Sequence, residues 1–190
     1  MAFPTRMTRT RLATVALAAL ALGADAPKQT VDADGIVFKA PAAWKSTKPT
    51  EQRFRRAYLK INPVEGDDDP AELVVTSMFG DGGGVDANVQ RWQGMFKSDG
   101  DGSPVRATTE TRKGKNVDDI TLVDVGGHYV AAIRPGSPQR FDKPHYRLLG
   151  AIVPGKQGTF FLKLTGPEKT VKAIRPAFDE LLASLSLVEP

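Results

Sequence analysis

The chain has 190 residues, no cysteine, and a formal net charge of +4 from 26 basic and 22 acidic residues. The missing cysteine excludes disulfides, thiol catalysis and zinc–thiolate sites. The net charge is small and does not indicate nucleic-acid binding.

Residues 1–26 have the pattern of a secretory signal peptide. Three arginines precede an uncharged apolar run, residues 12–22, and an Ala-x-Ala cleavage pattern ends at Ala26. This run is about half the roughly 20 residues that a membrane-spanning helix needs. We therefore expect cleavage, no membrane span in the mature chain, and export to the periplasm or the medium. Loss of the three arginines and Asp25 would leave a net charge of +2, and residues 27–190 have the size of one domain.

Alternation of apolar and polar residues predicts that most of the remaining chain is strand. A Gly-rich turn at 154–158 predicts a hairpin, and the polar turn at 63–70 separates two strands long enough to pair. The expected strands are residues 36–39, 52–62, 73–79, 105–111, 120–129, 146–153 and 159–165.

The glycine-rich stretch at 80–84 is followed by a predicted amphipathic helix. Asp86 occupies the expected N-cap position, where its carboxylate could accept from free backbone amides. Val89, Trp92 and Phe96 share one helical face, so Trp92 is expected to be a core anchor.

The opposite face of this helix, Gln90, Gln93 and Lys97, is expected to meet solvent. Arg91 lies beside the apolar stripe and could pair with Glu72 at the start of the preceding strand; independent surface charges are the alternative. The residues expected to have structural roles are Trp44, Glu72, Asp86, Arg91 and Trp92.

A second helix is predicted over the C-terminal apolar stripe, residues 171–185. Thr165 and Glu168 have the spacing of a capping box. Pro176 lies inside the stripe and predicts a kink or a break. Strands outnumber helices and the turns are short, so the predicted class is α+β, a mainly antiparallel sheet flanked by helices.

Two motifs suggest a ligand and are incomplete. Gly82-x-Gly84-x-x-Ala87 resembles a dinucleotide fingerprint, but Asp86 would repel phosphate and βαβ units are absent. No cofactor is therefore expected.

A calcium-loop spacing starts at Asp99 and continues through Asp101, Ser103 and Glu110. Pro104 stands where such a loop needs glycine, so no metal is expected and a solvated loop is favoured. The two histidines, His128 and His145, lie outside any hydrolase motif, and no catalytic residue is assigned.

Five segments resemble secreted bacterial proteins that are similar to the PsbP-like α/β/α sandwich. They are Phe38–Trp44, Ala71–Leu73, Gly83–Trp92, Tyr146–Ile152 and Phe161–Pro167. The resemblance implies an antiparallel sheet with helices on both faces, and domains of this kind usually bind partners and lack catalysis. It identifies no functional residue here.

The sequence therefore predicts a non-catalytic exported domain that binds a protein or a small ligand. A hydrolase with a dispersed active site and a calcium-dependent structural module remain as alternatives. Converging titratable groups in a pocket would favour the hydrolase, and a ligating cluster between Asp99 and Glu110 would favour the calcium module.

Overall fold

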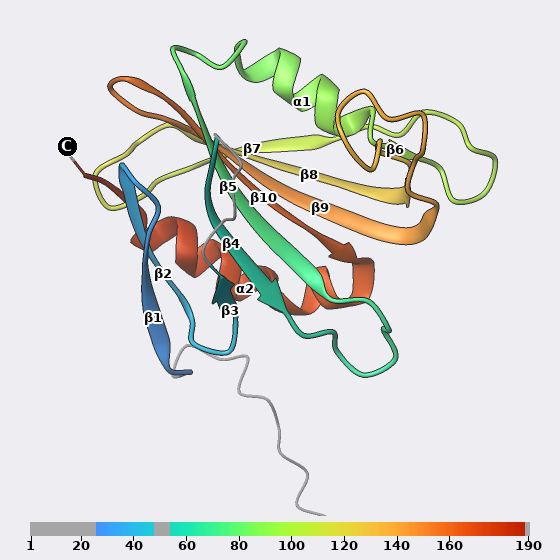
Figure 1. The fold of residues 1–190 in the computed structure, drawn as a ribbon, viewed down its shortest axis with the longest axis horizontal. Helices are drawn as coiled ribbons and strands as arrows, with labels where there is room; N and C mark the ends of the chain where they lie inside the picture. The colour runs from blue at the N-terminus through green and yellow to red at the C-terminus, as the bar shows by residue number, and fades with distance from the viewer. Residues whose placement is uncertain (1–25, 48–53, 189–190) are drawn as a thin grey trace, which may run out of the picture.

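A large antiparallel sheet forms the centre of the molecule in the computed structural model, which describes residues 26–47 and 54–188. Eight strands build it, in the order β3-β4-β5-β10-β9-β8-β6, with β7 paired to β8 (Figure 1). Their bounds are β3 Lys45–Thr47, β4 Arg55–Ile61, β5 Ala71–Phe79, β6 Phe96–Lys97, β7 Thr108–Arg112, β8 Ile120–Tyr129, β9 Lys143–Pro154 and β10 Gly158–Pro167. The expected signal peptide lies outside the described residues, apart from Ala26.

The main core lies between this sheet, helix α2 (Glu168–Ser184) and a second, three-stranded sheet. The small sheet joins β1 (Lys28–Asp32), β2 (Ile36–Pro41) and β11 (Ser186–Leu187). The apolar stripe of α2 follows helical spacing and is buried along its length, as burial of apolar surface requires.

Helix α1 (Val85–Gln93) covers part of the opposite face of the large sheet. Trp92 and Phe96 pack on this face in a second core cluster, which includes Val123 and Val125 of β8. The alternate β8 residues Leu122 and Asp124 point to the α2 face. The expected α+β class, with a mainly antiparallel sheet and a helix on each face, is confirmed.

Both expected hairpins are present. β9 pairs with β10 through the turn at residues 154–158, where the Gly155 amide donates to the Gly158 carbonyl at 2.8 Å. β4 pairs antiparallel with β5. The described part of the chain also contains four short strands that the alternation did not predict: β1, β3, β6 and β11.

Three details of the helices differ from the sequence prediction. The N-cap of α1 is Gly84, whose φ of 80° starts the helix at Val85, so Asp86 lies in the first turn and makes no capping bond. Thr165 belongs to β10, and α2 begins only at Glu168, so the capping box is absent. α2 is continuous through Pro176, which lies on the exposed side of the helix, so the expected break is absent.

Candidate functional site

A groove opens on the face of the large sheet that α1 covers only in part. Its volume is about 1100 Å³. Side chains of β4, β5 and β10 form the floor, while α1 and the irregular segment 131–141 form walls. Because α1 is only nine residues long, it cannot extend over all the strands of a sheet this wide.

The strand register decides which side chains face the groove. On this side of β5 and β10, Glu72 lies opposite Thr165, Val74 opposite Lys163, and Thr76 opposite Phe161. Alternate residues of the same strands, such as Leu73 and Leu164, face the main core. The period of two along each strand thus separates the groove floor from the core.

Lys163 occupies the middle of the floor. It makes no hydrogen bond or ion pair within 4 Å to any other residue that the structure describes. Burial lowers the pKa of its ammonium group, the nearby charge of Arg55 lowers it further, and the Glu72 carboxylate opposes both. The fold therefore holds a positive charge in partly dry surroundings without a partner inside the described part of the chain.

Two further polar atoms of groove residues lack partners among residues 26–47 and 54–188. The Arg55 Nε and the Thr165 hydroxyl are both buried and unbonded. Buried polar atoms in native proteins are nearly always hydrogen-bonded. Because both unbonded atoms lie in one groove, the groove floor is less stable than a floor with every polar atom bonded would be.

The acidic groups of the groove are already bonded. Glu72 accepts from the Tyr58 hydroxyl at 2.6 Å, and burial together with this bond raises the pKa of Tyr58 to about 12. Asp69 accepts from Lys143 and from the Tyr146 hydroxyl, each at 2.7 Å, and these bonds lower the pKa of its carboxyl.

Aromatic side chains line the wall opposite β4. Tyr129 stacks on Tyr146 with ring centroids 6.0 Å apart and lies 5.2 Å from Phe141. Trp92 meets Phe161 edge to face at 6.3 Å. The groove can therefore offer apolar contact area beside its charges.

The whole lining is electrically unbalanced. Asp69 and Glu72 are its acidic residues, whereas six basic residues line it: Arg55, Arg91, Arg134, Arg140, Lys143 and Lys163. The potential inside such a half-enclosed cleft favours anions.

Comparisons with known proteins give distant structural similarities and no family. No protein-family model matches the sequence, and no curated protein matches it. The solution structure of cyanobacterial PsbP from Synechocystis sp. PCC 6803 is similar, with a TM-score of 0.49, 12% identity, and coverage of 85% of this chain and 92% of that one. PA94 from Pseudomonas aeruginosa, a protein of unknown function, has a TM-score of 0.44 at 12% identity and covers 86% and 98%. The similarity is one of fold, and no residue role is transferred from either protein.

Several of the residues expected to have structural roles do lie near one another. Trp44 and Trp92 are buried, 3% and 5% exposed, Trp44 in the main core and Trp92 in the smaller one. Trp92, Glu72 and Arg91 also line the groove. Asp86 is exposed in the first turn of α1.

The expected Glu72–Arg91 pair is wrong. Glu72 bonds Tyr58 on the neighbouring strand, whereas Arg91 donates to the Asn88 Oδ1 at 2.6 Å, one helical turn away. The Asn88 side chain is buried and donates to the carbonyls of Gly82 and Gly84, so it anchors the glycine turn. Local contacts on β4 and α1 thus satisfy both charges.

The polar face predicted for α1 is also partly wrong. Gln93 is half-buried because its Oε1 accepts from the Ala107 amide at 3.0 Å. Gln90 and Lys97 are exposed, as expected, although Lys97 lies in β6 and not in the helix.

The residues of the calcium-loop pattern do not converge. Asp99 accepts from the His145 amide at 2.9 Å, Asp101 accepts from the Ser103 amide at 3.0 Å, and Glu110 pairs with Arg112. No group of three or more potential His, Cys, Asp or Glu ligands gathers anywhere in the described ranges. His128 contacts Asp142 at 2.5 Å, and neither histidine lines the groove.

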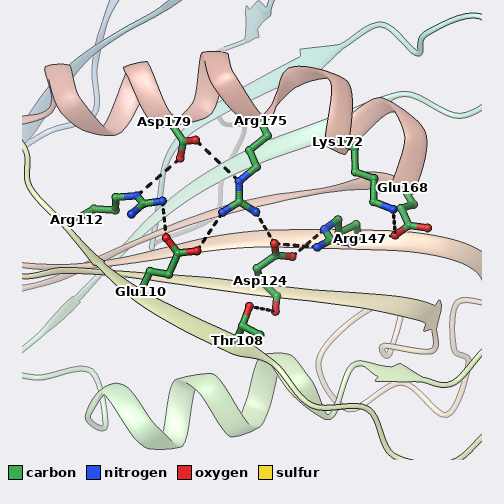
Figure 2. A network of polar contacts seen from close by, with 9 residues as sticks. All are labelled: Thr108, Glu110, Arg112, Asp124, Arg147, Glu168, Lys172, Arg175 and Asp179. Carbon is green, nitrogen blue, oxygen red and sulfur yellow. Dashed lines mark hydrogen bonds and ion pairs between the residues drawn. The ribbon is translucent and has the colours of Figure 1, made fainter.

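A second concentration of charge lies on the other face of the sheet, beneath α2 (Figure 2). Asp124 is 8% exposed and is held by Arg147 at 2.8 Å and by Arg175 at 2.5 Å. The labelled charged residues are four acids and four bases: Glu110, Asp124, Glu168, Asp179, Arg112, Arg147, Lys172 and Arg175. Because their charges balance and they pair with one another, we interpret the network as a structural link between α2 and strands β7–β9.

Sequence reasoning missed the groove residues Arg55, Lys163 and Thr165. Lys163 did carry a signal, because it interrupts the apolar segment Phe160–Leu164 on the side opposite to Leu162 and Leu164. Arg55 carried none, since a register shift between Arg55 and Ala57 decides its orientation. Within residues 26–47 and 54–188, no helix is both long enough and apolar enough to cross a membrane.

Proposed function

We propose that this protein is a non-catalytic exported domain that binds a small ligand in the groove over β4, β5 and β10. The observation that carries the proposal is Lys163, a half-buried cation at the centre of the groove floor without a partner among the described residues. Proteins usually pair such groups, because an isolated buried charge is unfavourable. A bound ligand would supply the partner.

Catalysis is not part of the proposal. The two histidines contact carboxylates outside the groove, His128 with Asp142 and His145 with Asp99. No histidine lines the groove, as far as the structure describes it, and the proposal assigns no nucleophile or general base. A protein partner is the alternative occupant, and the experiment below separates the two.

The test compares the wild-type domain with a variant whose groove is filled. Thr76 lies on the floor, opposite Phe161 and beside Arg55, so Thr76→Trp places a large ring in the groove. Thr30→Trp adds the same ring to an exposed position of β1, outside the groove, and is the matched control. Each tagged domain is incubated with envelope extract, and bound small molecules and proteins are identified by mass spectrometry.

We expect a small molecule that the wild type and Thr30→Trp retain and that Thr76→Trp loses. Circular dichroism and urea unfolding confirm that each variant is folded. If the three proteins retain the same molecules in the same amounts, the groove is not the binding site and the proposal is wrong.

Export is the second part of the proposal and rests on the pattern of residues 1–26. The intact mass of protein recovered from the envelope or medium measures it directly. We expect a chain that begins near Pro27. Material that still begins at residue 1 or 2 would contradict export by signal cleavage.

A further inference from the structure

We infer that the groove takes an amphiphilic organic carboxylate, with its carboxylate at Lys163 and its aliphatic or aromatic body against the apolar lining. This inference rests on the proposed groove function and names the class of ligand. Its basis is the combination of an unpaired lysine on the floor, bonded acids and exposed apolar side chains in the same groove.

The charge of the lining decides the sign of the ligand. Asp69 already accepts hydrogen bonds from Lys143 and Tyr146. Glu72 already accepts one from Tyr58. A cationic ligand would have to compete with those bonds. An anion instead meets Lys163, which has no competing partner within the described chain.

Three of the other lining cations are already bonded to the protein, which narrows the positions where an anionic group can bind. Lys143 pairs with Asp69, Arg91 donates to Asn88, and Arg140 donates to the Val130 carbonyl at 3.1 Å. Lys163 is open to a new partner at the floor, where the Arg55 Nε is also unbonded, and Arg134 on the wall makes no side-chain bond to another described residue. A polyanion such as a nucleic acid would need a row of open cations and would be repelled by the two acids.

The apolar part of the lining indicates that the anionic group carries a hydrocarbon body. Met78 and Ile133 are 41% and 47% exposed and both line the groove. Val74 lies next to Lys163 on the floor, and Trp92 and Phe161 continue the apolar surface. At about 1100 Å³ the groove is larger than an inorganic anion needs and slightly exceeds the usual volume of ligand pockets, about 300–1000 Å³.

The floor can also complete the coordination of a carboxylate. Thr165 follows Lys163 by two residues on the same strand, so both project to the same face. Its hydroxyl is unbonded in the described structure and can donate a hydrogen bond after a small side-chain adjustment. Charge-assisted bonds of this kind are stronger than neutral ones.

Isothermal titration calorimetry with three probes tests the assignment. Octanoate has both the carboxylate and the hydrocarbon body, 1-octanol lacks the charge, and acetate lacks the body. We expect octanoate to bind the mature domain about tenfold or more tightly than octanol, because the charged bond is lost in the alcohol, and acetate to bind more weakly than either.

Two lysine variants locate the carboxylate. Lys163→Gln should weaken octanoate about tenfold or more and leave octanol nearly unchanged. Lys39→Gln removes an exposed strand lysine outside the groove and should change neither. Octanol binding as tightly as octanoate, or octanoate binding Lys163→Gln as tightly as wild type, would overturn the inference.

The failure of this inference can be told from failure of the proposed function. If octanoate does not bind while octanol or a hexaglutamate peptide binds wild type and not Thr76→Trp, the carboxylate amphiphile is wrong and the groove function stands. If, in addition, Thr76→Trp retains the same envelope molecules as wild type, both are wrong.

Discussion

The contact between Trp92 and Gly150 gives the most demanding test of the packing described above. Gly150 lies on β9 directly under the indole ring of Trp92. A Cβ atom at position 150 would lie 2.1 Å from Cζ3, 2.5 Å from Cε3 and 2.9 Å from Cη2 of that ring. Such a carbon normally approaches no closer than about 3.4 Å, so the ring occupies the space of the missing side chain.

Each single change should therefore destabilise the protein. Trp92→Ala removes a side chain that is 5% exposed and should lower the free energy of unfolding by about 3–5 kcal/mol. Gly150→Ala overlaps the ring by more than 1 Å and, because the ring must shift within a packed core, should cost about 1–3 kcal/mol.

The double variant distinguishes this explanation from a general loss of stability. Without the ring, the methyl group that Gly150→Ala adds meets open space, so the double variant should be no less stable than Trp92→Ala alone. Urea denaturation followed by circular dichroism measures all three proteins. Additive losses, with a coupling energy near zero, would refute the proposed contact.

Two controls should leave stability within about 0.5 kcal/mol. Gln90→Ala changes an exposed residue of the same helix. Gly100→Ala adds a methyl whose nearest neighbour would be the Ser98 Oγ at 3.9 Å. Gln93 is unsuitable as a control because it bonds the Ala107 amide.

Three further predictions concern charges. Asp124→Ala should lower the free energy of unfolding by about 3–5 kcal/mol because it leaves two arginines without their buried partner, whereas Asp118→Ala, at an exposed pair, should cost under about 1 kcal/mol in the same denaturation assay. The bond from Lys172 lowers the pKa of Glu168, so this carboxylate stabilises the fold above its unfolded pKa of 4.5 and loses that contribution as pH falls through its lower folded value. Between pH 6 and pH 3, the free energy of unfolding of Glu168→Gln should therefore fall less than that of the wild type. Denaturation curves measured across this range test the prediction, and an equal fall in both proteins would contradict it. The folded pKa of Lys163 is lowered, so its charge destabilises the fold fully below that pKa, and this destabilisation shrinks as pH rises towards the unfolded pKa of 10.5. Lys163→Met should therefore have a higher free energy of unfolding than the wild type at pH 7, by a margin that decreases at alkaline pH. A variant that is less stable than the wild type at pH 7 would refute this.

Local patterns predicted most of the sheet and both helices. The alternation in β4, β5, β9 and β10 and the Gly-rich turn at 154–158 act over short distances and were confirmed. Details that depend on one backbone angle were missed: the positive φ of Gly84 places the start of α1 at Val85 and displaces Asp86 from the cap.

The groove could not be predicted, because it exists only where α1 leaves part of the sheet face uncovered. Lys163 alternates with core leucines, which shows only that it faces away from the main core. Whether that face is covered depends on the length and placement of α1. The orientation of Arg55 depends on a bulge in its strand, which no residue pattern in β4 indicated.

The small sheet has a consequence for the order in which the molecule can form. Val37 of β2 pairs with Ser186 of β11, and the hydroxyl of Ser186 reaches the Val37 carbonyl across 149 residues of sequence. In the large sheet, β5 likewise pairs with β10, which comes much later in the sequence. β2 and β5 therefore lack one of their partner strands until the C-terminal part of the chain is available. Contacts of such long sequence separation make folding slow. If the chain is exported as proposed, it would therefore remain unfolded during translocation until its final segment has crossed.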